Sequence, residues 1–153
     1  MEDLLNRADL RPLTGLYEPG AVLPGVVICH EPPFRLTRVR TAAGVLTVPE
    51  VHLAVGSSVR VRILARDVAL ADRRPEGIST QNIFRGRITG VSPTLGASVD
   101  VELDIGAPLL SRITGKAQAE LAVAVGREMY ALIKAVSITR ANVGDHQSTP
   151  APL

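Results

Sequence analysis

The sequence predicts an all-β protein built from two small β units of similar design, with little helix. Short apolar stretches that alternate with period two, separated by Gly- and Pro-containing turns, recur along the chain. Matching residues also recur 70 positions apart: Val55-Gly56 with Val125-Gly126, Ile63 with Ile133, Ala65 with Ala135 and Val68 with Ile138. Because the order of strands and turns before these positions is similar, we interpret the chain as an internal duplication. Chance likeness between short β segments is the alternative.

The first half is expected to begin with a short helix over residues 2–10, where Glu2 and Asp3 suit the positive end of the helix dipole. The Pro- and Gly-rich residues 15–25 are interpreted as a connection. Alternating apolar residues then predict strands over 26–29, 34–40, 45–48 and 59–63, with residues 67–70 continuing the last strand after a kink.

The second half repeats this pattern with strands over residues 84–91, 99–105, 109–113 and 129–138. Thr114 is expected to cap a short helix over residues 116–122, and Gly126 to end it. Short strands with one helix before the last strand fit a small Greek-key barrel of the OB type. The expected organisation is listed from the N-terminus: helix and linker 1–20, first unit 21–75, second unit 77–141, disordered tail 142–153.

The amino-acid composition argues against several classes of function. Of 153 residues, 46% are apolar, which is enough for a packed core. The near balance of 17 Lys and Arg against 15 Asp and Glu, with only 3% aromatic residues, argues against nucleic-acid binding. A single cysteine, Cys29, excludes an internal disulfide and favours a reducing compartment. No apolar run has the length of a membrane span, and Met1-Glu2-Asp3 does not open a signal peptide.

Catalytic motifs are missing from the sequence. It has no nucleophile elbow and no phosphate-binding loop with its lysine, and His30, His52 and His146 are far apart. We therefore expect no enzyme activity from this chain. The row Arg35, Arg38 and Arg40 could attract an anionic partner, or it could be a solvated strand face that discourages edge pairing.

Residues 78–88 form the most informative stretch, because the small polar residues Ser79-Thr80-Gln81-Asn82 turn directly into an alternating basic and apolar strand. Such residues favour caps and turns, and a turn can direct several backbone N–H groups at one anion. A plain cap and an anion-binding turn are both compatible with this pattern.

Residues 78–88 also resemble the opening of the Mop, or TOBE, molybdate-binding module, which is Ser-x-Arg-Asn followed by a Gly-basic-Val/Ile strand. Residues 111–121 and 130–138 resemble its middle and its closing strand, in the same order. Residues 3–7, 13–15 and 65–70 look like the regulatory region that follows the ATPase domain in molybdate-importer ABC subunits. The chain is thus similar to the C-terminal part of such a subunit, without its nucleotide-binding domain.

The resemblance implies a regulatory domain that binds molybdate or tungstate at the interface of a homodimer. One chain would supply Ser79, Thr80, Gln81 and Asn82, and the other Thr114, Lys134 and Ala135. ATP would act only through an upstream ATPase domain, and no metal ion is implied. The partners would be the transmembrane subunits of the importer, at the cytoplasmic face of the membrane.

Two positions depart from the family pattern. Gln81 stands where the family has an arginine, and Ala117 stands where it has a hydroxyl. A lost charge-assisted contact is worth about 1.5–3 kcal/mol, so these changes would weaken anion binding. Two other hypotheses therefore stay open: a purely structural dimerisation module, and an OB-type nucleic-acid binder, which composition disfavours.

Overall fold

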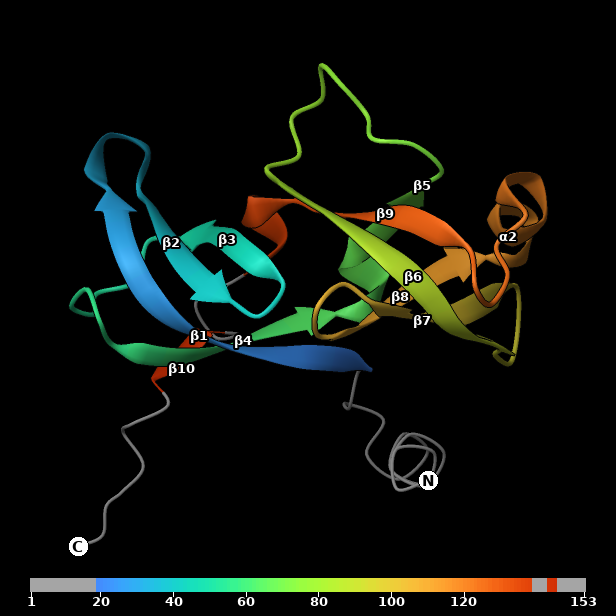
Figure 1. Ribbon diagram of the computed structural model, residues 1–153, viewed down its shortest axis with the longest axis horizontal. Helices are drawn as coiled ribbons and strands as arrows, with labels where there is room; N and C mark the ends of the chain where they lie inside the picture. The colour runs from blue at the N-terminus through green and yellow to red at the C-terminus, as the bar shows by residue number, and fades with distance from the viewer. Residues whose placement is uncertain (1–18, 139–142, 146–153) are drawn as a thin grey trace, which may run out of the picture.

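The computed structural model describes residues 19–138 and 143–145, which form two five-stranded antiparallel sheets with one α-helix (Figure 1). The predicted mostly-β fold with one short helix in the second half is confirmed. The helix predicted at residues 2–10 lies outside the described residues. Within the described part, no helix is long and apolar enough to cross a membrane.

Sheet A has the strand order β10-β4-β1-β2-β3 and sheet B the order β5-β9-β6-β7-β8. The strands of sheet A are β1 (Gly20–Glu31), β2 (Leu36–Thr41), β3 (Gly44–Pro49), β4 (Ser58–Leu64) and β10 (Val143–Asp145). The strands of sheet B are β5 (Val68–Ala71), β6 (Asn82–Pro93), β7 (Ser98–Asp104), β8 (Pro108–Thr114) and β9 (Glu128–Ile133). The remaining elements are the 3-10 turns η1 (Pro32–Phe34), η2 (Ala65–Asp67) and η3 (Ala135–Ser137), and helix α2 (Gly115–Leu121).

Backbone hydrogen bonds follow the same pattern in the two halves, as an internal duplication predicts. Val27 N–H donates to Ser57 O and Val27 O accepts from Gly56 N–H, and Ile88 makes the same pair of bonds with Arg127 and Gly126. A register shift follows Val27 in β1 and Ile88 in β6. Each half also ends its fourth strand in a 3-10 turn, η2 or η3, that begins with a buried alanine. The two halves therefore share one backbone frame.

The two halves exchange their last strands. β5 follows the first four strands along the chain but pairs with β9 of sheet B, and β10 follows the second four but pairs with β4 of sheet A. Ser111 on β8 donates a hydrogen bond to Val68 O at the start of β5 (2.7 Å), which ties the two borders of sheet B together. Neither sheet is therefore built from one continuous half of the sequence.

Several predicted boundaries were wrong. The connection predicted over residues 15–25 is strand from Gly20 onward, and Pro24 is tolerated there because β1 pairs with β2 only from Gly25. Residues 34–35 belong to η1 and its left-handed C-cap Arg35, so β2 starts at Leu36. The last long strand stops at Ile133, where η3 turns the chain.

The C-terminal part also differs from expectation. Helix α2 ends at Leu121, because Ala122 adopts a left-handed conformation and its N–H turns back to Ala119 O. Gly126, predicted to end the helix, instead takes a positive φ in the turn before β9. Residues 143–145 of the predicted disordered tail form β10, which pairs with β4 and covers its edge.

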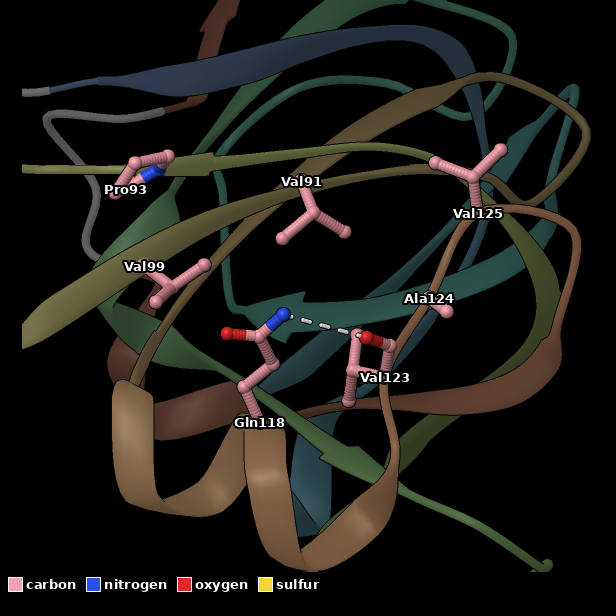
Figure 2. Close-up of a pocket in the computed structure, with 7 residues that line it drawn as sticks. All are labelled: Val91, Pro93, Val99, Gln118, Val123, Ala124 and Val125. Carbon is pink, nitrogen blue, oxygen red and sulfur yellow. Dashed lines mark hydrogen bonds between the residues drawn. The ribbon is translucent and has the colours of Figure 1, made fainter.

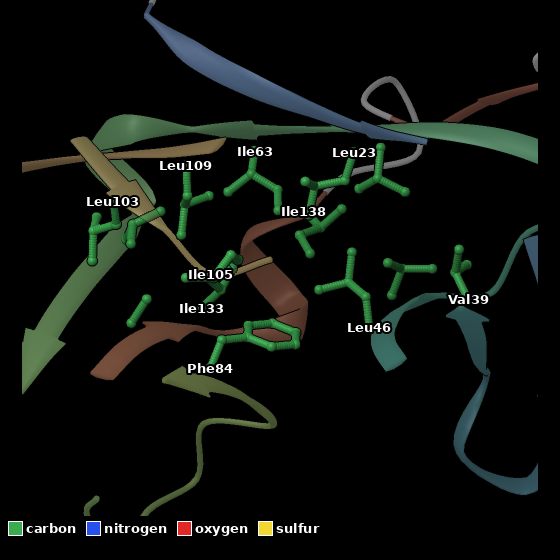
Figure 3. Packing of buried hydrophobic residues seen from close by; sticks show 14 of the residues in the cluster. Leu23, Val39, Leu46, Ile63, Phe84, Leu103, Ile105, Leu109, Ile133 and Ile138 are labelled. Carbon is green, nitrogen blue, oxygen red and sulfur yellow. The ribbon is translucent and has the colours of Figure 1, made fainter. Parts of the chain in front are cut away.

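One apolar core joins the two halves. Leu23, Leu46 and Ile63 from sheet A and Phe84, Ile133 and Ile138 from the second half belong to the same buried cluster (Figure 3). Since each half contributes one wall of this core, we expect the described residues to unfold as one unit.

Candidate functional site

The predicted site residues at the start of β6 and the end of β9 lie together. Asn82 pairs with Ile133 across the β6–β9 ladder, so Gln81 and Lys134 extend from the same end of two neighbouring strands. Figure 1 shows this end beside η3, with the loop that precedes β6 above it. Ser79, Gln81 and Lys134 are exposed and Thr80 is half-buried. A solvent-borne ligand can therefore reach three of these four side chains.

Lys134 supplies positive charge at this end. No carboxylate among the described residues forms an ion pair with its ammonium. Its backbone is held because Lys134 O accepts from Ser137 N–H (3.0 Å) at the start of η3. The next residue, Ala135, is 6% exposed and packs into the structure. This arrangement directs an uncompensated cation into solvent from a fixed backbone.

Asn82 is held differently from its neighbours. It is 2% exposed, its Oδ1 accepts from Thr47 N–H (2.8 Å), and its Nδ2 donates to Thr47 O (3.0 Å). The amide thus pairs with the peptide groups of β3 as another strand would. Asn82 fixes the start of β6 against sheet A, and the exposed polar groups of the turn belong to Ser79 and Gln81.

Gln81 occupies the position expected for an arginine. Its Nε2 makes one long hydrogen bond, to Ser79 O (3.5 Å), on the surface. A neutral amide can donate to an anion but offers no charge and no fixed fork of donors. At this end of sheet B, positive charge next to the polar turn is therefore supplied by Lys134, which follows the neighbouring strand β9.

Thr114 lies at the opposite end of sheet B. Pro93 at the far end of β6 pairs with Val99, and Ser98 beside it pairs with Thr114. Because β6 has 12 residues, this end is roughly 35 Å from Asn82 at full extension. Thr114 Oγ1 accepts from Ala117 N–H (3.0 Å) and caps α2, as predicted. One chain alone does not bring Thr114 to Lys134, so the expectation that one chain supplies Thr114, Lys134 and Ala135 together to one site is wrong.

A hollow near Thr114 was not predicted from the sequence. It has a volume of about 450 Å³ and lies between the end of β6 and α2 (Figure 2). Its lining is Val91, Pro93, Val99, Gln118, Val123, Ala124 and Val125. Gln118 is its only amide side chain, and Nε2 donates to Val123 O (3.4 Å). No charged side chain lines it, so the hollow by itself is poorly suited to a dianion.

The arginines of sheet B are paired with carboxylates across strands. Arg85 and Arg87 on β6 both reach Glu128 on β9, and Arg112 binds Asp100 in a bidentate pair (2.7 and 3.0 Å). The hydrogen bond and positive charge of Arg85 hold the pKa of Glu128 below its usual range. Among the described residues, no group of three or more His, Cys, Asp or Glu side chains could hold a metal ion.

The chain matches one known domain family and is similar to several known proteins. Residues 78–139 match the model of the TOBE domain. The chain is 41% identical over 144 residues to a molybdenum import ATP-binding protein, ModC, of Mesorhizobium japonicum, and 41% identical over 144 residues to that of Paramagnetospirillum magneticum. It is 34% identical over 152 residues to the ModC of Rhodospirillum rubrum.

The matches cover 94–95% of this chain but only 39–41% of those relatives, so the chain spans about two fifths of their length. Among solved structures, the chain is similar to the cytoplasmic molybdate-binding protein ModG, with a TM-score of 0.70. That match covers 82% of this chain and 95% of ModG at 23% identity, which supports the fold.

Proposed function

Because the chain carries a TOBE domain and is homologous to the C-terminal region of molybdenum import ATP-binding proteins, we propose that it is a regulatory, oxyanion-binding region of such a subunit. Its ligand would be molybdate or tungstate. ATP hydrolysis would belong to an ATPase region outside this chain. Its partners would be the transmembrane subunits of the importer. The chain itself would lie at the cytoplasmic face of the membrane.

The proposal rests on the arrangement of side chains where β6 begins and β9 ends. There the ammonium of Lys134, which pairs with no carboxylate among the described residues, extends beside the exposed polar turn of Ser79 and Gln81. A tetrahedral dianion needs several convergent donors, and an ammonium, a hydroxyl and an amide can supply them. Asn82 would act by holding this turn against β3.

A homodimer would complete the site. Thr114 lies at the far end of sheet B, so it can contribute only from a second copy of the chain. Anion binding between two copies would favour one arrangement of the attached ATPase regions over another. A ligand regulates in this way only if it binds the two arrangements with different affinities.

A purely structural role in dimerisation is the alternative that the sequence supports, because Gln81 lacks the expected charge and Ala117 the expected hydroxyl. In that case the chain would position the ATPase regions without an anion. Molybdate would then leave the association of two copies unchanged.

Titration calorimetry separates these two functions. We expect molybdate and tungstate to release binding heat that sulfate does not match. Lys134→Ala should weaken molybdate binding at least tenfold, since a charge-assisted contact contributes about 1.5–3 kcal/mol. Arg60→Ala is the matched control, because it removes one exposed cation from β4 of sheet A, away from every residue of the proposed site. Equally negligible heats for all three anions would refute oxyanion binding.

A further inference from the structure

The outer face of sheet A combines an exposed apolar stripe with arginines on both sides. β1 contributes Val22, Pro24 and Val26, of which the two valines are 50% and 40% exposed. We call this surface the arginine face; its basic members are Arg60 and Arg62 on β4 and Arg38 and Arg40 on β2. It contains none of the residues of the proposed anion site.

Strand register fixes the spacing of the arginine face. Pro24 pairs with Arg60 and Val22 with Arg62 on one side of β1, and Val26 pairs with Arg40 on the other. Neighbouring strands lie about 4.8 Å apart, so β2 and β4, which carry the arginines, are roughly 10 Å apart across the stripe. The two pairs are offset along β1, because Arg38 lies beside Cys29, beyond the end of the stripe. Along β1 the stripe extends over residues 22–26, about 13 Å.

Part of this positive charge, that of Arg40 and Arg60, is not neutralised on the face itself. Arg38 lies 3.8 Å from Glu31, but neither Arg40 nor Arg60 pairs with a carboxylate in the part of the chain that the structure describes. The outer face of sheet B, which has the same backbone frame, pairs its arginines with Glu128 and Asp100. The excess charge is therefore specific to sheet A.

Protection of a sheet edge does not account for these arginines. β2 lies between β1 and β3, and β4 lies between β10 and β1, so both are interior strands. Charges that discourage edge pairing belong on the outermost strands. An apolar centre with surrounding arginine is instead the composition typical of a protein interface.

We propose that the arginine face binds an amphipathic acidic helix of another protein. A helix with its side chains is about 10–12 Å across, which matches the separation of β2 and β4. The 13 Å stripe corresponds to about nine helical residues at 1.5 Å each. Leucines on one helix face would cover Val22 and Val26, and carboxylates on both flanks would reach Arg60 and Arg40. This inference is independent of the proposed oxyanion function.

A synthetic helix of about 15 residues, with a leucine stripe flanked by glutamates on both sides, tests the proposal. Its binding to the full chain is measured by fluorescence anisotropy. We expect saturable binding that weakens with added salt. Arg40→Gln together with Arg60→Gln should weaken it at least tenfold, and Val22→Ser with Val26→Ser should also weaken it.

Arg85→Gln with Arg87→Gln on sheet B is the matched control, since it removes the same charge from the other sheet. Thermal melts of all variants establish that each is folded. An equal loss of affinity for the two arginine pairs would show general charge attraction and overturn the proposal. So would equal binding of a peptide with lysines in place of glutamates, or binding of phosphatidylserine vesicles but not of the peptide.

Discussion

The first and second halves of the chain share a backbone frame but fill the same place with different chemistry. His30 in β1 bridges Thr37 Oγ1 (2.9 Å) and Leu53 O (2.8 Å), and the carbonyl requires the imidazole to donate from Nε2. Register and the repeated turns place Val91, Val101 and Val123 at the corresponding positions of the second half. Two of these valines line the hollow beside α2.

The glycines, unlike these side chains, are the same in the two halves, so they are the residues that specify the shared backbone frame. Both halves keep a glycine where two strands approach closely: a Cβ on Gly25 would lie 2.6 Å from Arg40 O, and one on Gly86 would lie 3.0 Å from Asp104 O. Both also keep the positive-φ glycines Gly56 and Gly126. Such backbone requirements are retained in both halves, whereas the polar bridge and the hollow show that the side chains have diverged around them.

The largest effect is expected where the second half is attached to the first. Asn82→Ala should lower the free energy of unfolding by about 2–4 kcal/mol, because the buried N–H and C=O of Thr47 lose their partners. Denaturant unfolding measures this. The control Ser79→Ala, at an exposed position, should change stability by less than about 0.5 kcal/mol. An unchanged midpoint for Asn82→Ala would show that the contact with β3 contributes nothing.

A smaller loss is expected when the first half is made to resemble the second. His30→Val should destabilise the protein by about 1–3 kcal/mol, since Leu53 O and the Thr37 hydroxyl lose the ring between them. Val91→Ala in the second half borders a hollow that is already open and should cost about 1 kcal/mol or less. If the two substitutions cost the same, the imidazole bridge is not what distinguishes the halves.

Strand periodicity predicted most of the fold because the inward residues of each strand are apolar and alternate. It failed where the backbone departs from a strand without a strong residue signal. Residues 134–138 continue an apolar pattern, yet η3 replaces the strand. The exchange of β5 and β10 could not be predicted either, because it depends on which sheet edge is free once the two halves pack together.

The candidate site was predicted only in part for a similar reason. The order of motifs along the chain indicated Gln81 and Lys134, and register brings these two together. No sequence signal revealed that Asn82 turns inward to β3, since an asparagine before a strand is equally compatible with an exposed turn. The hollow depends on small side chains from separate elements and has no local signature.

The smallest effect concerns the charges that distinguish sheet B from sheet A. Arg85 holds the pKa of the exposed Glu128 carboxyl below its usual range, first by a hydrogen bond and then by its charge. A depressed pKa in the folded state contributes stability above the ordinary carboxyl pKa and loses it as the pH falls through the lowered value. Glu128→Gln should therefore be slightly less stable than the parent near neutral pH and equal to it in acid. Thermal melts across this pH range check the prediction, and added salt should shrink the difference because both groups face solvent. A difference that persists in acid would place the contribution of Glu128 in packing rather than in charge.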